Sequence, residues 1–514
     1  MNKKRALILL FLIIAVGFIV RLPKFLTIIP EAGVFGPKIA WYDETVSIYF
    51  SSQNLTRTVA LSGLDTTPCL FFVLLHFWLL IVGTGSVALI AILPFIFSLA
   101  AIAAIYFLGK EIFDEQVGLF AALLMSLSPL NIQYATEIRA YSVLVLIAIF
   151  FILFLLRAIK RGQKSDFIGL AIFTLLLLYT HYSSAALIVP AYILLYYYKK
   201  TEIKKIIVCA AAVAVGYIPA LMVFERWGDF VGVGSESFYG RFFSHGDIFA
   251  LFQYLYTIVF GVVGINAVPA MLSIFIIALM IYFWRNYGET KNRILAILVI
   301  SGWVMLAVLK FIYTERYYII FTIPMILMFA VVLANLKRKS WLGVVGGAAV
   351  IFSLFIIPSY ITDNSRMDNS RAFKYFAPSF AQIILNESRP GDIVVADHYS
   401  HVLWTQYLKS GPEVKFFFPY KNTLTDDWQI RWRYSDYPII TEKNVILIDS
   451  LIEGSGRFWV AGYRGEAVED PRGNLFKYLD STYGRLATYY FPQNTDGNVY
   501  LAELRLYSST RNGK

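Results

Sequence analysis

The first two thirds of the sequence alternate long apolar runs with short polar stretches. A helix that crosses a bilayer needs about 20 apolar residues. Convincing candidates lie at about 6–22, 86–109, 117–133, 140–159, 165–181, 183–198, 205–224, 266–285, 294–312, 317–335 and 341–358. Two short apolar runs, at 68–82 and 247–263, are ambiguous. The pattern predicts an α-helical polytopic membrane protein with about 11 to 13 transmembrane helices.

The placement of Lys and Arg decides between these numbers. If the two short runs do not span, most of the basic residues lie in loops on the same side as the amino-terminal MNKKR, as the positive-inside rule requires. If both runs span, the basic loops near 160 and 202 move outside. About eleven spans are therefore favoured, with the short runs partly inserted or interfacial, and thirteen is the alternative. Both numbers predict a multi-pass cell-membrane protein with a cytoplasmic amino terminus and an extracytoplasmic carboxyl terminus.

The pattern changes after Pro358, where charged residues, Asn and Gly replace the apolar runs. This change predicts a transmembrane domain over 1–358 and a soluble, extracytoplasmic α/β domain over 359–514. An amphipathic helix is expected over 371–387 and another helix around 400–408. Strands are expected at 392–397, 414–418, 444–448 and 458–462.

Composition supports the membrane assignment. The chain is 58% hydrophobic and 15% charged, whereas soluble domains carry about a quarter charged residues. The net charge of +11 could suggest nucleic acid, but the basic residues are spread over short loops between apolar runs. We therefore expect contact with membrane lipids and no nucleic-acid partner.

Several polar residues fall in the loops expected outside the membrane. Asp43 and Glu44 follow two aromatic residues in the first loop, Glu137 and Arg139 share a short turn, and Arg316 follows Glu315 in a later turn. Each has a structural interpretation as a solvated acid pair or a local ion pair. Carboxylates beside a membrane are also suited to proton abstraction, and arginines to holding a phosphate.

The order of these motifs resembles the GT-C superfamily of membrane glycosyltransferases, and within it the branch of protein O-mannosyltransferases and lipid A aminoarabinose transferases. The resemblance covers about 6–335. Its cues are the Asp43-Glu44 pair, the run Pro68-Cys69-Leu70-Phe71-Phe72, the segment from Ser126-Leu127-Ser128-Pro129 to Glu137-Ile138-Arg139-Ala140-Tyr141-Ser142, and Glu315-Arg316-Tyr317. It implies a GT-C-like transmembrane catalytic domain.

The resemblance also implies a reaction. A monosaccharide would pass, with inversion, from a polyprenyl phosphate to a lipid, protein or polysaccharide acceptor at the external membrane face. Asp43 would be the general base, with Glu44 and Glu137 as further acidic site residues. Arg139 and Arg316 would bind the donor phosphate. Further donor or acceptor contacts are expected from Asp65, Tyr134, His181 and Tyr317.

The resemblance assigns no metal ligand, although a divalent ion held by Asp43 and Glu137 stays open. Two departures from the relatives stand out. Thr67-Pro68 replaces a double proline, and no WWDxG motif of oligosaccharyltransferases is present. The second departure disfavours transfer of a whole oligosaccharide to asparagine.

Two other functions fit a membrane protein with this pattern. A transporter or flippase for lipid-linked glycans typically shows inverted repeats and polar groups at mid-membrane, and the sequence shows neither. A non-catalytic cell-envelope assembly subunit would tolerate the loss of Asp43, Glu137 and Arg316. The sugar, the acceptor and the length of the lipid chain are not determined by the sequence.

Overall fold

The computed structural model describes most of the chain and divides it into two compact units. The first comprises Met1–Ile39 and Phe50–Arg366, and the second comprises Ala40–Tyr49 and Met367–Lys514. The residues described are 2–29, 34–37, 40–63, 67–223, 276–277, 280–309, 315–335, 379–396, 404, 407–408, 411–417, 440–463, 473–490 and 502–512.

The first unit is a bundle of helices. Its order is α1 (Lys3–Arg21), η1 (Leu22–Phe25), the hairpin β1 (Leu26–Ile29) and β2 (Val34–Pro37), the end of α2 (Tyr42–Ser51), α3 (Leu55–Ser62), α4 (Cys69–Val82), α5 (Val87–Ile112), α6 (Glu115–Leu127), α7 (Pro129–Gln133), α8 (Tyr141–Lys160), α9 (Lys164–Thr180), η2 (Tyr182–Ser184), α10 (Ala185–Tyr198), η3 (Lys200–Glu202), α11 (Ile203–Val223), α16 (Thr290–Leu309), η4 (Glu315–Phe321) and α17 (Thr322–Ala334).

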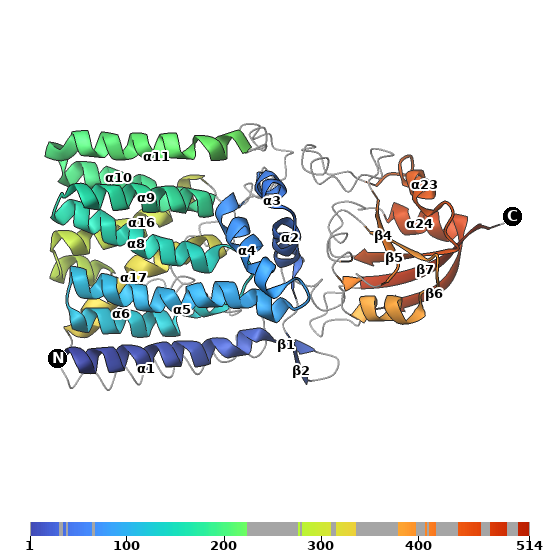
Figure 1. Ribbon diagram of the computed structural model, residues 1–514, viewed down its shortest axis with the longest axis horizontal. Coiled ribbons are helices and arrows are strands. Elements are labelled where there is room, and N and C mark those ends of the chain that lie inside the picture. The colour runs from blue at the N-terminus through green and yellow to red at the C-terminus, as the bar shows by residue number, and fades with distance from the viewer. Residues whose placement is uncertain are drawn as a thin grey trace. The chain divides into compact units, whose positions relative to one another are not determined.

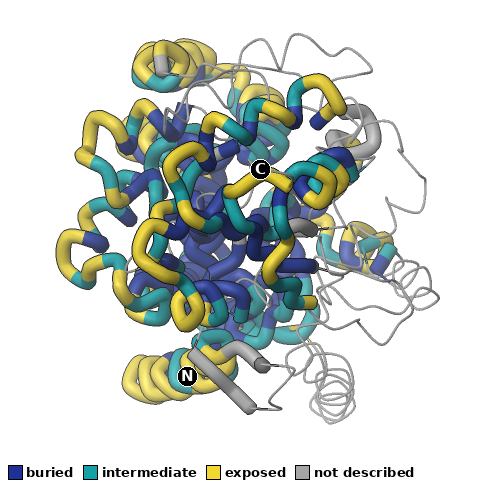
Figure 2. Tube along the Cα trace, turned by 90° about the vertical axis from the view of Figure 1, so that its right-hand side faces the viewer, coloured by how far each residue is buried: buried dark blue, intermediate teal, exposed yellow. Residues whose placement is uncertain are grey.

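Several of these helices are suited to crossing a membrane. Among the described residues, five helical stretches are long and apolar enough to do so, and they begin at Lys3, Val87, Tyr141, Lys200 and Arg316. The stretches at Tyr141 and Arg316 are 72% buried within the protein, whereas those at Lys3 and Lys200 are 22% and 17% buried. The helices α8 and α17 therefore form the core of the bundle, and α1 and α11 lie at its edges (Figures 1 and 2).

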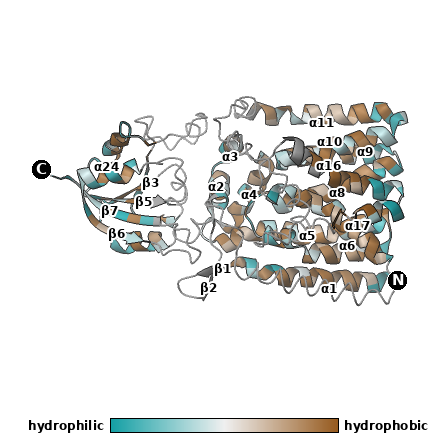
Figure 3. Ribbon diagram, turned by 180° about the vertical axis from the view of Figure 1, so that it is seen from behind, coloured by the Kyte–Doolittle hydropathy of each residue, from teal (hydrophilic) through white to brown (hydrophobic). Residues whose placement is uncertain are grey.

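The sequence prediction of a polytopic helical protein with a carboxyl-terminal α/β region is confirmed, and apolar residues cover the helices of the bundle (Figure 3). The short run at 68–82 is a helix, α4, but the runs at 247–263 and 341–358 lie outside the described residues. The run at 117–133 is not one helix. It breaks at Ser128, which has an extended backbone (φ −64°, ψ 117°), because the residue before a proline avoids the α conformation.

The second unit contains a mixed five-stranded sheet of order β4-β3-β5-β7-β6. The strands are β3 (Ile393–Ala396), β4 (Glu413–Phe416), β5 (Arg457–Tyr463), β6 (Tyr483–Tyr490) and β7 (Ala502–Arg511). The strand β3 pairs in parallel with β4 and β5, while β7 pairs antiparallel with β5 and β6. Phe458 and Trp459 are both fully buried and belong to separate core clusters, so the sheet is covered on both faces.

The predicted strands at 392–397, 414–418 and 458–462 correspond to β3, β4 and β5. The predicted strand at 444–448 is wrong, because Val445–Ile448 is a 3-10 helix, η6, that leads into α23 (Asp449–Ile452). The strands β6 and β7 and the helix α24 (Asn474–Thr482) were not predicted. Of the predicted helix at 371–387, residues 379–387 are described and are helical.

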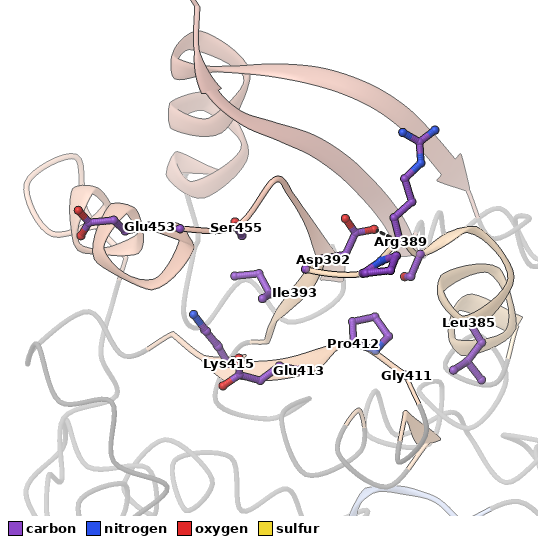
Figure 4. A pocket seen from close by; sticks show the side chains of 14 residues that line it. Leu385, Arg389, Asp392, Ile393, Gly411, Pro412, Glu413, Lys415, Glu453 and Ser455 are labelled. Atoms are coloured by element: carbon purple, nitrogen blue, oxygen red, sulfur yellow. Dashed lines mark hydrogen bonds between the residues drawn. The ribbon is translucent and has the colours of Figure 1, made fainter.

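A cavity of about 570 Å³ opens where β3 and β4 begin (Figure 4). The charged residues that line it make contacts that stabilise the sheet. Asp392 is buried and accepts two hydrogen bonds from Arg457, at 3.1 and 2.5 Å, and Lys415 donates to the carbonyl of Leu451 at 2.9 Å. These contacts tie the starts of β3, β4 and β5 to one another and to α23.

Candidate active site

The turn between α7 and α8 carries most of the polar residues that the sequence singles out. The helix α7 is short, and Tyr134 ends it. The Ser142 hydroxyl donates to the Tyr134 carbonyl at 3.0 Å, and the Arg139 amide donates to the Glu137 carbonyl at 2.7 Å. Tyr134, Glu137 and Arg139 are all buried, at 1%, 7% and 5% exposure. The turn is therefore part of the protein interior rather than a solvated loop.

Arg139 connects this turn to the start of α4. Its Nη2 donates to the Thr67 hydroxyl at 2.9 Å, and its Cζ lies 6.0 Å from the centre of the Phe72 ring. A guanidinium has five donors in a planar fork, and these two contacts help to orient the group.

Arg21 is hydrogen-bonded to the end of α6, just before α7. It is fully buried at the end of α1. Its Nε donates to the Ser98 hydroxyl at 2.9 Å, and its Nη1 and Nη2 donate to the carbonyls of Ser126 and Met125 at 2.8 and 3.2 Å. These carbonyls lie at the end of α6, where four C=O groups lack helical partners. Arg21 therefore caps α6 at the break that precedes α7.

A row of aromatic rings joins the turn to the end of α9 and to η4. The ring centres of Tyr134 and Tyr141 are 5.1 Å apart, those of Tyr141 and His181 are 5.8 Å apart, and those of His181 and Tyr317 are 5.0 Å apart. His181 Nδ1 accepts from the Ser183 amide at 3.1 Å. In the neutral ring this leaves the proton on Nε2.

The start of α17, directly after η4, is joined to α7 by a buried hydrogen bond. The Asn131 amide donates to the Thr322 hydroxyl at 3.1 Å and to the Ser128 hydroxyl at 2.8 Å. Arg316 is the second residue of η4, the segment that leads into this contact. The Cζ of Arg316 lies 5.8 Å from the centre of the Tyr317 ring.

Three charged groups lie within electrostatic range of one buried phenol. The charges of Arg316, Arg139 and Glu137 all act on the Tyr141 hydroxyl. Cations in a low-dielectric surrounding favour an anionic ligand, and a guanidinium can hold two oxygens of a phosphate.

Asp43 and Glu44 belong to the second unit, in the first turn of α2. Glu44 is fully buried, and its Oε2 accepts from the Trp41 amide at 3.1 Å. It therefore caps its own helix in the manner of a capping box. Asp43 is half-buried. It lies at the start of the helix, where backbone N–H groups have no helical partners.

The segment that carries Asp43 is supported by the carboxyl-terminal residues of its unit. The Tyr407 hydroxyl donates to the Ala40 carbonyl at 3.4 Å. Burial, and then the charge of Glu44, raise the pKa of Tyr407. Tyr407 thus keeps its proton at neutral pH and remains a donor to the backbone just ahead of α2.

The predicted site residues fall into three groups. Glu137, Arg139, Tyr134, His181, Tyr317 and Arg316 come together in the first unit. Asp43 and Glu44 lie in the second unit, and Asp65 lies outside the described residues. The described part of the chain holds no group of three or more His, Cys, Asp or Glu residues that could bind a metal ion.

Three contributors were not expected from the sequence. The sequence assigned no role to Arg21 or Tyr141, and Thr67 was noted only as a departure from the relatives. A signal for Arg21 is its place directly after an apolar run, since a charge at the end of a membrane helix needs partners. The roles of Thr67 and Tyr141 depend on contacts between helices that are distant in sequence.

Comparison with known proteins identifies structures with a similar fold. Residues 66–224 match the family model described as dolichyl-phosphate-mannose-protein mannosyltransferase. A search of curated proteins finds no match. Among solved structures, ArnT from Cupriavidus metallidurans in the apo state is similar, with a TM-score of 0.63, 13% identity and coverage of 98% of each chain.

Two further structures contain a lipid phosphate. ArnT from Cupriavidus metallidurans bound to undecaprenyl phosphate has a TM-score of 0.64 at 11% identity, again over 98% of each chain. The oligosaccharyltransferase AglB from Archaeoglobus fulgidus, in complex with an inhibitory peptide and a dolichol-phosphate, has a TM-score of 0.52 at 13% identity. That match covers 98% of this chain and 77% of AglB. The chain therefore has the fold of the GT-C superfamily of membrane glycosyltransferases, and part of its first unit matches the mannosyltransferase model.

Proposed function

We propose that the protein is a glycosyltransferase that moves a monosaccharide from a polyprenyl phosphate to an acceptor hydroxyl at the extracytoplasmic face of the membrane. The observation that carries the proposal is that Arg139 and Arg316 belong to one region. Arg139 lies in the turn before Tyr141, and Arg316 lies beside Tyr317, whose ring is joined to that of Tyr141 through His181. A chain of the same fold, ArnT from Cupriavidus metallidurans, binds undecaprenyl phosphate. The proposed donor of this chain and the ligand of ArnT are thus both lipids that carry a phosphate.

In the proposed reaction, Asp43 is the general base. Its carboxylate takes the proton of the acceptor hydroxyl, and the acceptor oxygen attacks the anomeric carbon of the sugar. The bond from that carbon to the phosphate oxygen breaks, and the electron pair leaves with the polyprenyl phosphate. A single attack from the face opposite the leaving group inverts the anomeric configuration.

The arginines act on the leaving group. Negative charge grows on the phosphate as the bond breaks, and cations that are already oriented stabilise that charge without rearranging. Arg139 is oriented by Thr67 and Phe72, and Arg316 by its place at the start of η4. Glu137 would contact the donor sugar or the acceptor, and His181, Tyr134 and Tyr317 would line the same space.

Glu44 is proposed to position Asp43 rather than to take part in proton transfer. Its carboxylate is fully buried and accepts from the Trp41 amide, so it stabilises the start of α2. We therefore assign Glu44 as a positioning residue for Asp43. A direct contact between Glu44 and the acceptor is not part of the proposal.

The test compares two acidic residues of the second unit. Membranes containing wild type, Asp43→Asn or Glu453→Gln receive a radiolabelled polyprenyl-phosphate sugar, and new glycosidic product is counted. Asp43→Asn is expected to lose at least about 100-fold in rate, the usual scale of general base catalysis. Glu453 is exposed and far along the chain from α2, so Glu453→Gln is expected to keep the full rate.

Other outcomes would exclude the proposal. Normal transfer by Asp43→Asn would show that Asp43 is not the base. Movement of the labelled lipid across proteoliposomes without a new glycosidic bond would identify a transporter. An unchanged cell envelope after mutation of Asp43, Glu137 and Arg316 together would identify an assembly subunit.

A further inference from the structure

A second cavity lies in the first unit, away from the cluster around Tyr141. It has a volume of about 640 Å³, within the range of small-molecule sites. The ends of α5, α8 and α10 and the start of α16 form its walls. The cavity lies at the last turn of α8, whereas Tyr141 is the first residue of that helix. The full length of α8 therefore separates the two.

Three lysines from different elements line this cavity. Lys160 is in the last turn of α8, Lys199 follows α10, and Lys291 is in the first turn of α16. Lys291 is held in place by Glu289 at 3.1 Å and by the carbonyl of Ile112 at 3.4 Å. The Glu289 carboxylate also lines the cavity and pairs with Lys291, whereas the described residues place no carboxylate within ion-pair distance of Lys160 or Lys199. The lining therefore carries more positive than negative charge.

A single lysine at the end of a helix is explained by the helix dipole. Three lysines around one cavity are not, because each repels the others. Such an arrangement is stabilised when an anion occupies the space between them. Other parts of the lining are apolar and come from Ile112, Leu156, Ile159 and Ile294. The cavity thus combines a cationic lining with an apolar one.

We propose that this cavity binds the headgroup phosphate of an anionic phospholipid. The lysines would contact the phosphate, and the isoleucine and leucine side chains would contact the apolar part of the lipid. Basic cavities between membrane helices are suited to such headgroups. The apolar walls favour a lipid over a soluble phosphate, which has no apolar part to bury. The site is independent of sugar transfer.

The test measures lipid binding to the full chain in detergent by native mass spectrometry. Phosphatidylglycerol, phosphatidylcholine and inorganic phosphate are titrated separately against wild type and against Lys160→Gln/Lys199→Gln. We expect wild type to prefer phosphatidylglycerol. The double variant should bind it roughly 30-fold more weakly, since each lysine near a headgroup contributes about 1 kcal/mol and 1.4 kcal/mol is a factor of ten.

The matched control is Lys164→Gln/Lys204→Gln, which removes two exposed lysines that do not line the cavity. This variant has the same net charge as the first, so a general electrostatic effect would weaken binding equally in both. Equal loss would overturn the proposal, and so would equal binding of the two lipids to wild type. Displacement of phosphatidylglycerol by millimolar inorganic phosphate would show a site for free phosphate and would overturn the lipid assignment.

Each variant is also passed over a size-exclusion column. Elution at the same volume as wild type shows that the variant is folded. The readout is binding rather than transfer. Failure here therefore leaves the proposed reaction intact, and loss of transfer in Asp43→Asn leaves the lipid site intact.

Discussion

Some residues in the interior of the bundle carry charges that would be costly to desolvate in lipid. Arg21 is fully buried, and its guanidinium donates to Ser98, Ser126 and Met125. Its desolvation is offset because each of these bonds is made by an ionised donor. Arg139 follows the same rule with the Thr67 hydroxyl. In both cases the arginine joins segments that are far apart in the sequence.

The Thr67 hydroxyl provides a prediction at this scale. Thr67→Val keeps the shape of the side chain and removes the acceptor of the Arg139 hydrogen bond. A hydrogen bond to a charged group contributes about 1.5–3 kcal/mol. If Arg139 binds the donor phosphate, we expect KM for the lipid donor to rise at least about tenfold with a smaller change in kcat.

Thr67→Ser is the control, since it keeps the hydroxyl and is expected to keep KM within about twofold of wild type. Steady-state kinetics with the lipid donor as the varied substrate checks both variants. Equal KM values for Thr67→Val and wild type would show that Arg139 does not depend on Thr67.

At the scale of elements, the close contact of α5 and α6 depends on two glycines. A β-carbon at Gly118 would lie 2.6 Å from the Tyr106 carbonyl oxygen, and one at Gly109 would lie 2.8 Å from the Gly118 Cα. These neighbours are backbone atoms, which cannot move aside as a side chain can. The glycines therefore allow the two helices to approach closely, as small residues do between membrane helices.

Gly118→Ala is predicted to separate α5 from α6. Overpacking of this kind costs about 1–3 kcal/mol, so we expect a lower Tm of the protein in detergent, measured by fluorescence during heating. Because α6 leads directly to α7, transfer activity should fall as well. Gly85→Ala is the control, since no heavy atom lies within 4 Å of a β-carbon there. A Tm for Gly118→Ala equal to that of Gly85→Ala would contradict the contact.

At the scale of the whole molecule, the distribution of Lys and Arg predicts a cytoplasmic amino terminus and an extracytoplasmic second unit. Both expected numbers of spans, about eleven or thirteen, are odd and lead to the same prediction. The proposed reaction needs this orientation, since Asp43 belongs to the second unit.

Cysteine labelling tests the orientation. Cys69 and Cys209 are free and can be replaced by alanine. A single cysteine at Glu453→Cys is then expected to react with a membrane-impermeant maleimide in intact cells. Thr201→Cys, in a basic loop of the bundle, is expected to react only after the cells are opened. Both positions are exposed, so burial does not explain a difference. The reverse pattern would invert the topology and exclude an extracytoplasmic reaction.

The sequence by itself determined the class of the protein and the positions of the five described helices that are long and apolar enough to cross a membrane. A helix in lipid must satisfy its own backbone hydrogen bonds and present apolar side chains, so each span is visible in one continuous segment. The break at Ser128 was also available from the sequence through Pro129, although the run was interpreted as one helix. Parallel strands such as β3, buried on both faces, were found from their continuous apolar residues.

The tertiary structure alone decided which residues meet. The strands β6 and β7 carry polar residues, and their pairing with each other and with β5 is a contact between distant segments. Val445–Ile448 is as apolar as a strand, yet it forms a 3-10 helix that buries Val445 and Ile448 in the core. Arg21 capping α6, and Arg139 bonded to Thr67, likewise follow from helix packing, which no local pattern of the sequence encodes.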